Sequence, residues 1–77
     1  MNEQTRKQIQ KLLDQMQTMV TSIEQLQSEE QEKFDNLSES AQESERGENI
    51  SEAADILQSA VDNLQEVINN LEEAAAL

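Results

Sequence analysis

The sequence predicts an all-α fold in which two long helices form an antiparallel hairpin and two hairpins associate into a four-helix bundle. Three observations lead to this prediction. Two segments repeat apolar residues with a period of seven, neither segment contains Gly or Pro, and one irregular stretch separates them. Such spacing is typical of helices that bury one long face. A chain of 77 residues has room for one small domain, so we expect residues 1–77 to form a single hairpin domain.

The first helix is expected at about residues 2–33. Its large apolar side chains fall at positions a, d and e of a heptad written a to g: Ile9, Met16 and Ile23 at a, Leu12, Met19 and Leu26 at d, and Leu13 and Val20 at e. The pattern breaks at Glu30, an acid at an a position. We therefore expect Glu30 to mark the place where the helix leaves the bundle.

The second helix is expected at residues 49–73 and repeats the same pattern. Its apolar residues are Ile50, Leu57, Leu64 and Leu71 at a, Ala53, Ala60 and Val67 at d, and Ala54, Val61 and Ile68 at e. Asn49, with Glu52 three residues later, resembles a helix N-cap with a capping box. Because most d positions are Ala, we expect them to pack closely against the larger d residues of the first helix.

The connector, residues 34–48, contains the only Phe and the only Gly of the chain. Ser40 followed by Glu43 predicts a short helix over 40–46, with Gly47 as its left-handed C-cap. Phe34 and Leu37 are expected to fold back over the end of the hairpin. The simplest interpretation of this stretch is a solvated linker closed by two apolar side chains.

The width of the apolar stripes predicts self-association. Apolar residues at a, d and e form a stripe wider than one two-helix seam can cover, and such stripes are typical of four-helix bundles. The expected core of a homodimer or larger assembly consists of Ile9, Leu12, Leu13, Met16, Met19, Val20, Ile23, Leu26, Leu57, Val61, Leu64, Ile68 and Leu71. Alternatively, a helix or groove of another protein covers the exposed half of each stripe.

The charge is strongly acidic and unevenly distributed. Residues 1–23 hold three basic and two acidic residues, a net of +1, whereas residues 24–77 hold two basic and fifteen acidic residues, a net of −13. Such a surface repels nucleic acid and anionic lipid, so we expect neither direct nucleic-acid binding nor membrane binding. It fits a basic protein partner. The same charge would also serve solubility alone, and the sequence leaves both interpretations open.

Ten acids surround the connector: Glu24, Glu29, Glu30, Glu32, Asp35, Glu39, Glu43, Glu45, Glu48 and Glu52. We expect this end of the hairpin to bind a protein partner. The contact residues predicted for it are Phe34, Asp35, Asn36, Leu37, Glu43, Glu45 and Arg46. Phe34 and Leu37 would be apolar anchors, and the acids would steer the partner electrostatically.

Residues with catalytic or metal-binding chemistry are scarce. The chain has no His and no Cys, so its Ser and Thr hydroxyls lack the imidazole base of a catalytic triad. Met16 and Met19 could be ligands of a soft metal, but Met at positions a and d usually fills a core. No glycine-rich phosphate-binding motif is present. Residues 35–39 begin like a calcium loop, but Leu37 stands where a ligand is required. We expect no enzyme activity, no cofactor and no metal.

Two expectations concern location and the C-terminus. No segment approaches the roughly 18 apolar residues of a membrane span, so a cytoplasmic protein is expected.

Ala74 to Leu77 resemble residues that an expression vector adds before a tag. The native chain would then end near Glu73, and the last four residues would carry no function.

The connector also carries a resemblance. The runs EKFDNLSE (residues 32–39) and QESERGE (residues 42–48), followed by a helix with Leu57, Leu64 and Leu71, resemble short acidic proteins encoded in phage and prophage genomes. Those relatives are expected to have Pro where Ser38 stands. The resemblance implies a phage context, and hence a bacterial host cytoplasm, but no mechanism.

The leading interpretation is therefore a non-catalytic, phage-type interaction protein. It would inhibit a host defence or nucleic-acid-handling protein through its acidic hairpin end. One alternative is a structural coiled-coil or scaffold protein that only oligomerises. Another is a regulatory subunit that donates an amphipathic helix to a partner.

Overall fold

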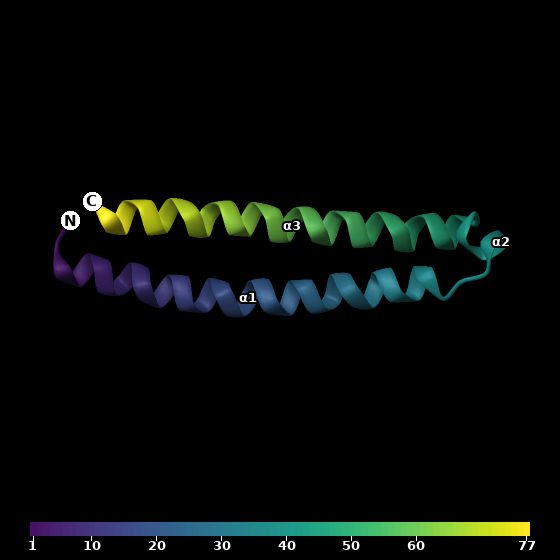
Figure 1. The fold of residues 1–77 in the computed structure, drawn as a ribbon, viewed down its shortest axis with the longest axis horizontal. Helices are drawn as coiled ribbons and strands as arrows, with labels where there is room; N and C mark the ends of the chain where they lie inside the picture. Colours follow the sequence, from purple (N-terminus) through teal and green to yellow (C-terminus); the bar gives the residue numbers. More distant parts are fainter.

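The computed structural model of residues 1–77 is a thin rod of 58 × 15 × 12 Å, built only from helices (Figure 1). Helix α1 (Glu3–Asp35) and helix α3 (Glu45–Ala76) run antiparallel along the rod, and the short helix α2 (Glu39–Gln42) closes one end. The two termini lie together at the other end. The predicted all-α fold with two long packed helices is confirmed.

Helix α1 begins at the N-cap Asn2, whose side-chain oxygen accepts a hydrogen bond from the Thr5 N–H at 2.8 Å. It continues to Asp35, two residues beyond the expected end. The expectation that Glu30 marks the departure of the helix was wrong. Glu30 is half-buried within α1, and its carboxylate lies 2.7 Å from the Lys33 ammonium. The helix therefore continues past Glu30 beside α3, with the Glu30 charge paired.

Helix α3 begins four residues earlier than predicted. Its N-cap is Ser44, whose hydroxyl accepts a hydrogen bond from the Gly47 N–H at 3.2 Å, so Asn49 lies inside the helix and caps nothing. The expectation of a left-handed Gly47 was also wrong, because no residue of the chain has a positive φ. Gly47 is instead a buried residue in the first turn of α3.

Helix α2 is shorter than expected and begins before Ser40. Its N-cap is Ser38, which accepts a hydrogen bond from the Ala41 N–H at 3.3 Å, and its C-cap is Glu43. The predicted helix over 40–46 is thus divided between α2 and the start of α3. The Gln42 side chain donates to the Phe34 carbonyl at 3.0 Å, which ties α2 to the end of α1.

The C-terminal residues belong to the helix. Helix α3 passes Glu73 and ends at Ala76. Ala75 packs against the hydrophobic core, and its carbonyl accepts a hydrogen bond from Arg6 Nε at 3.2 Å. Whatever the origin of residues 74–77, this hydrogen bond joins the start of α1 to the end of α3, at the end of the rod that holds both termini.

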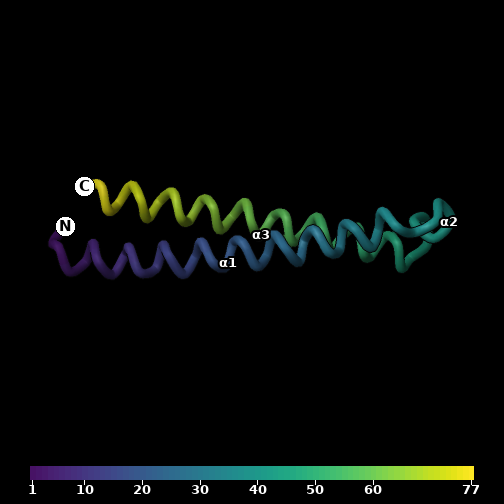
Figure 2. Tube along the Cα trace, turned by 60° about the horizontal axis from the view of Figure 1, so that its bottom comes forward, coloured from purple at the N-terminus to yellow at the C-terminus, as the bar shows by residue number.

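The seam between the long helices uses positions a and e of both heptads. Its buried cluster is Ile9, Leu13, Val20, Val61 and Ile68, with Met16, Ile23, Leu64, Leu71 and Ala75 packed around it. Alternating steps of three and four residues wind two helices around each other, and their traces cross toward α2 in Figure 2. The expected packing of d alanines against the large d residues of α1 does not occur within this seam. The fully buried alanine is Ala54, at an e position.

Candidate interaction surfaces

The hairpin leaves the large side chains at its d positions exposed. Leu12 is 44% exposed, Met19 51%, Leu26 51% and Val67 42%, and Ile56, one position outside the heptad stripe, is 60% exposed. These fractions differ sharply from the 8% or less of the core residues on the same helices. We define the apolar face as Leu12, Met19, Leu26, Ala53, Ile56, Ala60 and Val67.

Both helices contribute to this face because they are antiparallel and share the same seam positions. The d column lies beside the a column on each helix, and an antiparallel pair turns both d columns to the same side of the hairpin. The register in which Arg6 reaches Ala75 places Met19 within about 3 Å of the level of Ala60 along the rod. Leu12 then lies near Val67, and Leu26 lies near Ala53. The result is one continuous stripe, with large side chains from α1 and smaller ones from α3.

The opposite side of the hairpin is polar. Its b positions are Gln10, Gln17, Glu24 and Gln31 on α1 and Ser51, Gln58, Gln65 and Glu72 on α3. Several of these glutamines donate to a carboxylate one turn later: Gln10 to Asp14 at 3.0 Å, Gln31 to Asp35 at 3.0 Å and Gln58 to Asp62 at 3.1 Å. The two broad sides of the rod therefore differ in chemistry, and only one of them is apolar.

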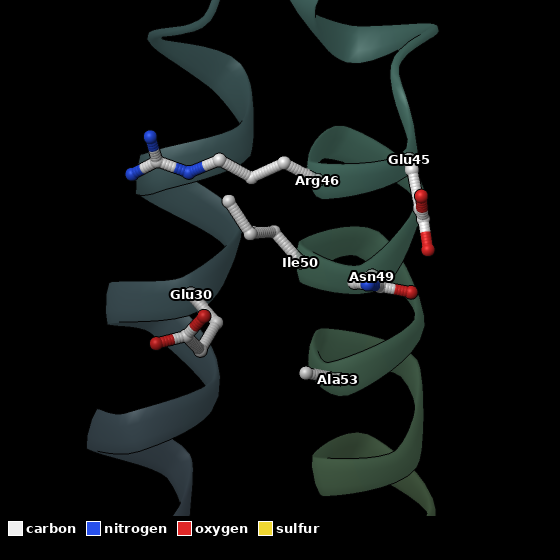
Figure 3. Close-up of a pocket in the computed structure, with 6 residues that line it drawn as sticks. All are labelled: Glu30, Glu45, Arg46, Asn49, Ile50 and Ala53. Atoms are coloured by element: carbon white, nitrogen blue, oxygen red, sulfur yellow. The ribbon is translucent and has the colours of Figure 1, made fainter.

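A shallow pocket of about 420 Å³ lies where the apolar face meets the connector end. It is lined by Glu30, Glu45, Arg46, Asn49, Ile50 and Ala53. In Figure 3 the side chains of Arg46 and Ile50 extend from α3 toward α1, where Glu30 stands. The pocket exists because the d position here is the small Ala53, so nothing fills the space above Ile50.

The acidic end consists of the ten acids from Glu24 to Glu52 named above. Nine of them are exposed, and only Glu30 is half-buried. The pair of Glu30 with Lys33 is the one ion pair of the structure. The hydrogen bond to the Glu30 carboxylate, and then its negative charge, raise the pKa of Lys33. The acidic end thus presents nine exposed carboxylates that form no ion pair.

The structure brings some of the predicted partner-binding residues together. Asp35 and Asn36 end α1, Glu43 lies between α2 and α3, and Glu45 and Arg46 open α3; all five side chains are exposed. Glu45 and Arg46 share the pocket with Glu30, whereas Asn36 lines a second hollow with Glu29, Glu32 and Lys33.

Phe34 and Leu37, the two expected apolar anchors, are half-buried. Phe34 lies at an e position, which in this hairpin belongs to the seam. Part of each side chain is therefore covered and part is accessible to a partner. That they fold back over the hairpin end stays a prediction.

Sequence reasoning missed members of the apolar face. Ile56 lies at position g and was assigned to no surface, although it stands three residues after Ala53 and four before Ala60. That spacing puts it beside both on a helix. Val67, Ala53 and Ala60 were placed in the heptad but not among the expected core residues. Testing each apolar residue for neighbours three and four residues away would have found them.

The remaining features of the chain do not point to a further site. No three His, Cys, Asp or Glu side chains are grouped so that they would hold a metal ion. No helix combines the length and the apolar character needed to cross a membrane. Comparisons with protein-family models, with curated proteins and with solved structures found no match to this chain.

Proposed function

We propose that this chain is a non-catalytic protein-interaction module that assembles through its apolar face into a homodimeric four-helix bundle. The observation that carries the proposal is the exposure of Leu12, Met19, Leu26, Ile56 and Val67 along one side of the hairpin. Contiguous apolar patches on soluble proteins mark interaction sites. Burying these side chains against another protein would be favourable by about 25 cal/mol for each Å² removed from water.

A second copy is the occupant that the dimensions favour. The rod is 58 Å long, and the apolar face occupies about 21 Å at its middle, from Leu12 to Leu26 on α1. A second hairpin has the same length and carries the same apolar segment at its middle. Two such faces together would give each helix two neighbours, which is the four-helix arrangement for stripes at a, d and e.

Sedimentation equilibrium of two matched variants tests the assembly. Met19→Glu adds a negative charge to the centre of the apolar face, whereas Gln17→Glu adds the same charge to the polar side of the same helix. We expect the parent chain and Gln17→Glu to be dimers and Met19→Glu to be a monomer that keeps its helical circular dichroism. A parent chain that stays monomeric at every concentration would contradict the proposal.

The acidic end supports a second candidate function, the binding of a basic protein surface. It is favoured by nine exposed carboxylates and a single ion pair around the connector. In the phage context that the connector resemblance implies, the partner would be a host defence or nucleic-acid-handling protein, and binding would inhibit it. Because the attraction is between exposed charges, it would weaken as salt is raised.

Capture from nuclease-treated host lysate at low and high salt tests this candidate. One variant changes Glu39, Glu43, Glu45 and Glu48 to Gln, and its control neutralises Asp55, Asp62, Glu66 and Glu72 farther along α3. Loss of a salt-sensitive basic protein with the first variant only would support the acidic end. Equal capture by both variants would refute it.

The two remaining alternatives predict different outcomes of the same capture experiment. A purely structural coiled-coil protein would recover only itself. A regulatory subunit that donates a helix would recover a partner that resists high salt and is lost in Met19→Glu.

A further inference from the structure

We infer that the two copies of the dimer pack head-to-tail, with the connector end of each beside the chain termini of the other. This arrangement rests on the proposed dimerisation through the apolar face and specifies its geometry. It follows from the distribution of charge along that face.

Two symmetric dimers can bring the apolar faces of two hairpins together. In the first, the connector ends lie side by side, and α1 of each copy lies over α3 of the other. In the second, the connector ends lie at opposite ends of the bundle, so that α1 lies over α1 and α3 lies over α3, both antiparallel. The two differ in which residues face each other across the interface.

Charge disfavours the first dimer. With the connectors together, two sets of ten acids would share one end of the bundle. Lys33 and Arg46, which continue the two d columns beyond Leu26 and Ala53, would face each other across the interface as like charges. Like charges that face each other slow the association of the two copies and raise the free energy of the complex.

The head-to-tail dimer instead sets opposite charges side by side. The first part of α1 carries Arg6, Lys7 and Lys11, which are the other three basic residues of the chain. It would lie next to the acidic end of the second copy. With Met19 at the centre of the interface, Lys11 of one copy lies near Glu29 of the other. Complementary potentials of this kind fix the orientation of an interface.

The ends of α3 complement each other in the same way. With Ala60 at the centre, Arg46 of one copy lies over the last turn of α3 in the other, near Glu73. A helix C-terminus carries a partial negative charge and favours a cation. The last turn of α3 contains no basic side chain. Arg6 of the same chain already donates to the Ala75 carbonyl, and Arg46 of the second copy would add a second positive charge at this helix end.

Side-chain size does not separate the two dimers. In the head-to-tail dimer Ala53 of one copy lies opposite Val67 of the other, whereas in the dimer with the connectors together Ala53 lies opposite Leu26. Either arrangement places a larger apolar side chain over the pocket of about 420 Å³ beside Ala53. The choice between the two dimers therefore rests on charge.

Electron–electron distance measurement between spin labels distinguishes the two dimers. The chain has no Cys, so a Ser40→Cys variant carries one label per copy, on the exposed side of α2. The rod is 58 Å long, so in the head-to-tail dimer we expect the labels about 50 Å apart. A distance below roughly 25 Å, as neighbouring helix ends would give, would overturn the inference.

A charge-swap cycle gives an independent test. Lys11→Glu and Glu29→Lys are each expected to weaken head-to-tail dimerisation by about two- to fivefold, and the double variant is expected to recover most of that loss. In the dimer with the connectors together these residues lie at opposite ends, so the two changes would simply add, which would also overturn the inference. A parent chain that is monomeric by sedimentation would instead refute the proposed dimer itself.

Discussion

Gly47 in the first turn of α3 lies directly against the backbone carbonyl of Ala41 at the end of α2. A Cβ atom on Gly47 would clash with that carbonyl oxygen and would lie 2.8 Å from the carbonyl carbon of Gln42. Since these are backbone atoms, they cannot move aside as a flexible side chain would. The glycine is needed here for close approach between two helices, with no requirement for an unusual φ.

Gly47→Ala is therefore expected to destabilise the protein, although Ala is the better helix former by about 1 kcal/mol. The cost of the forced contact, about 1–3 kcal/mol, should outweigh that gain. Urea denaturation followed by circular dichroism measures the difference. Ser59→Ala, an exposed change in the same helix, should leave the midpoint unchanged or raise it. A more stable Gly47→Ala variant would show that α2 does not lie against α3 in this way.

The start of α3 gives a second test, because two residues compete as its cap. Ser44→Ala removes the hydroxyl that accepts from the Gly47 N–H and should cost about 1 kcal/mol. Asn49→Ala, at an exposed site inside the helix, should be neutral or slightly stabilising, because Ala has the higher helix propensity. If Asn49→Ala were instead the more destabilising variant in urea denaturation, α3 would begin at Asn49, the N-cap that the sequence motif predicted.

These boundaries show where the sequence was sufficient and where it was not. Heptad spacing and the absence of Gly and Pro predicted two long helices correctly, since these features act along the whole length of each element. The caps depend on a choice between similar short motifs. Ser38, Ser44 and Asn49 all have the chemistry of an N-cap, and the packing of α2 on α3 at Gly47 decides between them.

The division of the apolar stripe was likewise beyond the sequence. Positions a, d and e are apolar in both helices, and either a with d or a with e, which alternate steps of three and four residues, can form a two-helix seam. The structure buries a and e, as Ile68 and Val61 illustrate, and leaves Met19 exposed at d. The acidic end could be predicted because it depends on the count of charges near the connector. Ile56 could not be assigned by heptad letter, since it lies outside the stripe.

The pair of Lys33 with Glu30 predicts a pH dependence at high pH only. Its raised pKa means that the folded state holds the Lys33 proton more tightly than the unfolded chain does. The stabilisation is complete below the ordinary value of 10.5 and is lost as the pH rises through the higher folded-state pKa. The difference in melting temperature between the parent chain and Lys33→Met should thus stay constant from pH 6 to 9 and shrink above about pH 10.5.

Lys7→Met serves as the control for that titration, because the Lys7 ammonium makes no ion pair. A Lys33→Met difference that grows with pH would mean that the ammonium is destabilising in the folded protein.

Two isoleucines of α3 allow the core of the hairpin and its apolar face to be tested separately. Ile68 is 0% exposed and Ile56 is 60% exposed, so the same substitution to Ala removes the same atoms from opposite environments. In the Met19→Glu background, where the hairpin is expected to be monomeric, Ile68→Ala should cost roughly 2–5 kcal/mol of unfolding free energy and Ile56→Ala less than about 0.5 kcal/mol. In the parent background, Ile56→Ala should additionally weaken dimerisation in sedimentation equilibrium, because it removes part of the apolar face. Equal costs in the monomer would mean that α1 and α3 do not meet along positions a and e.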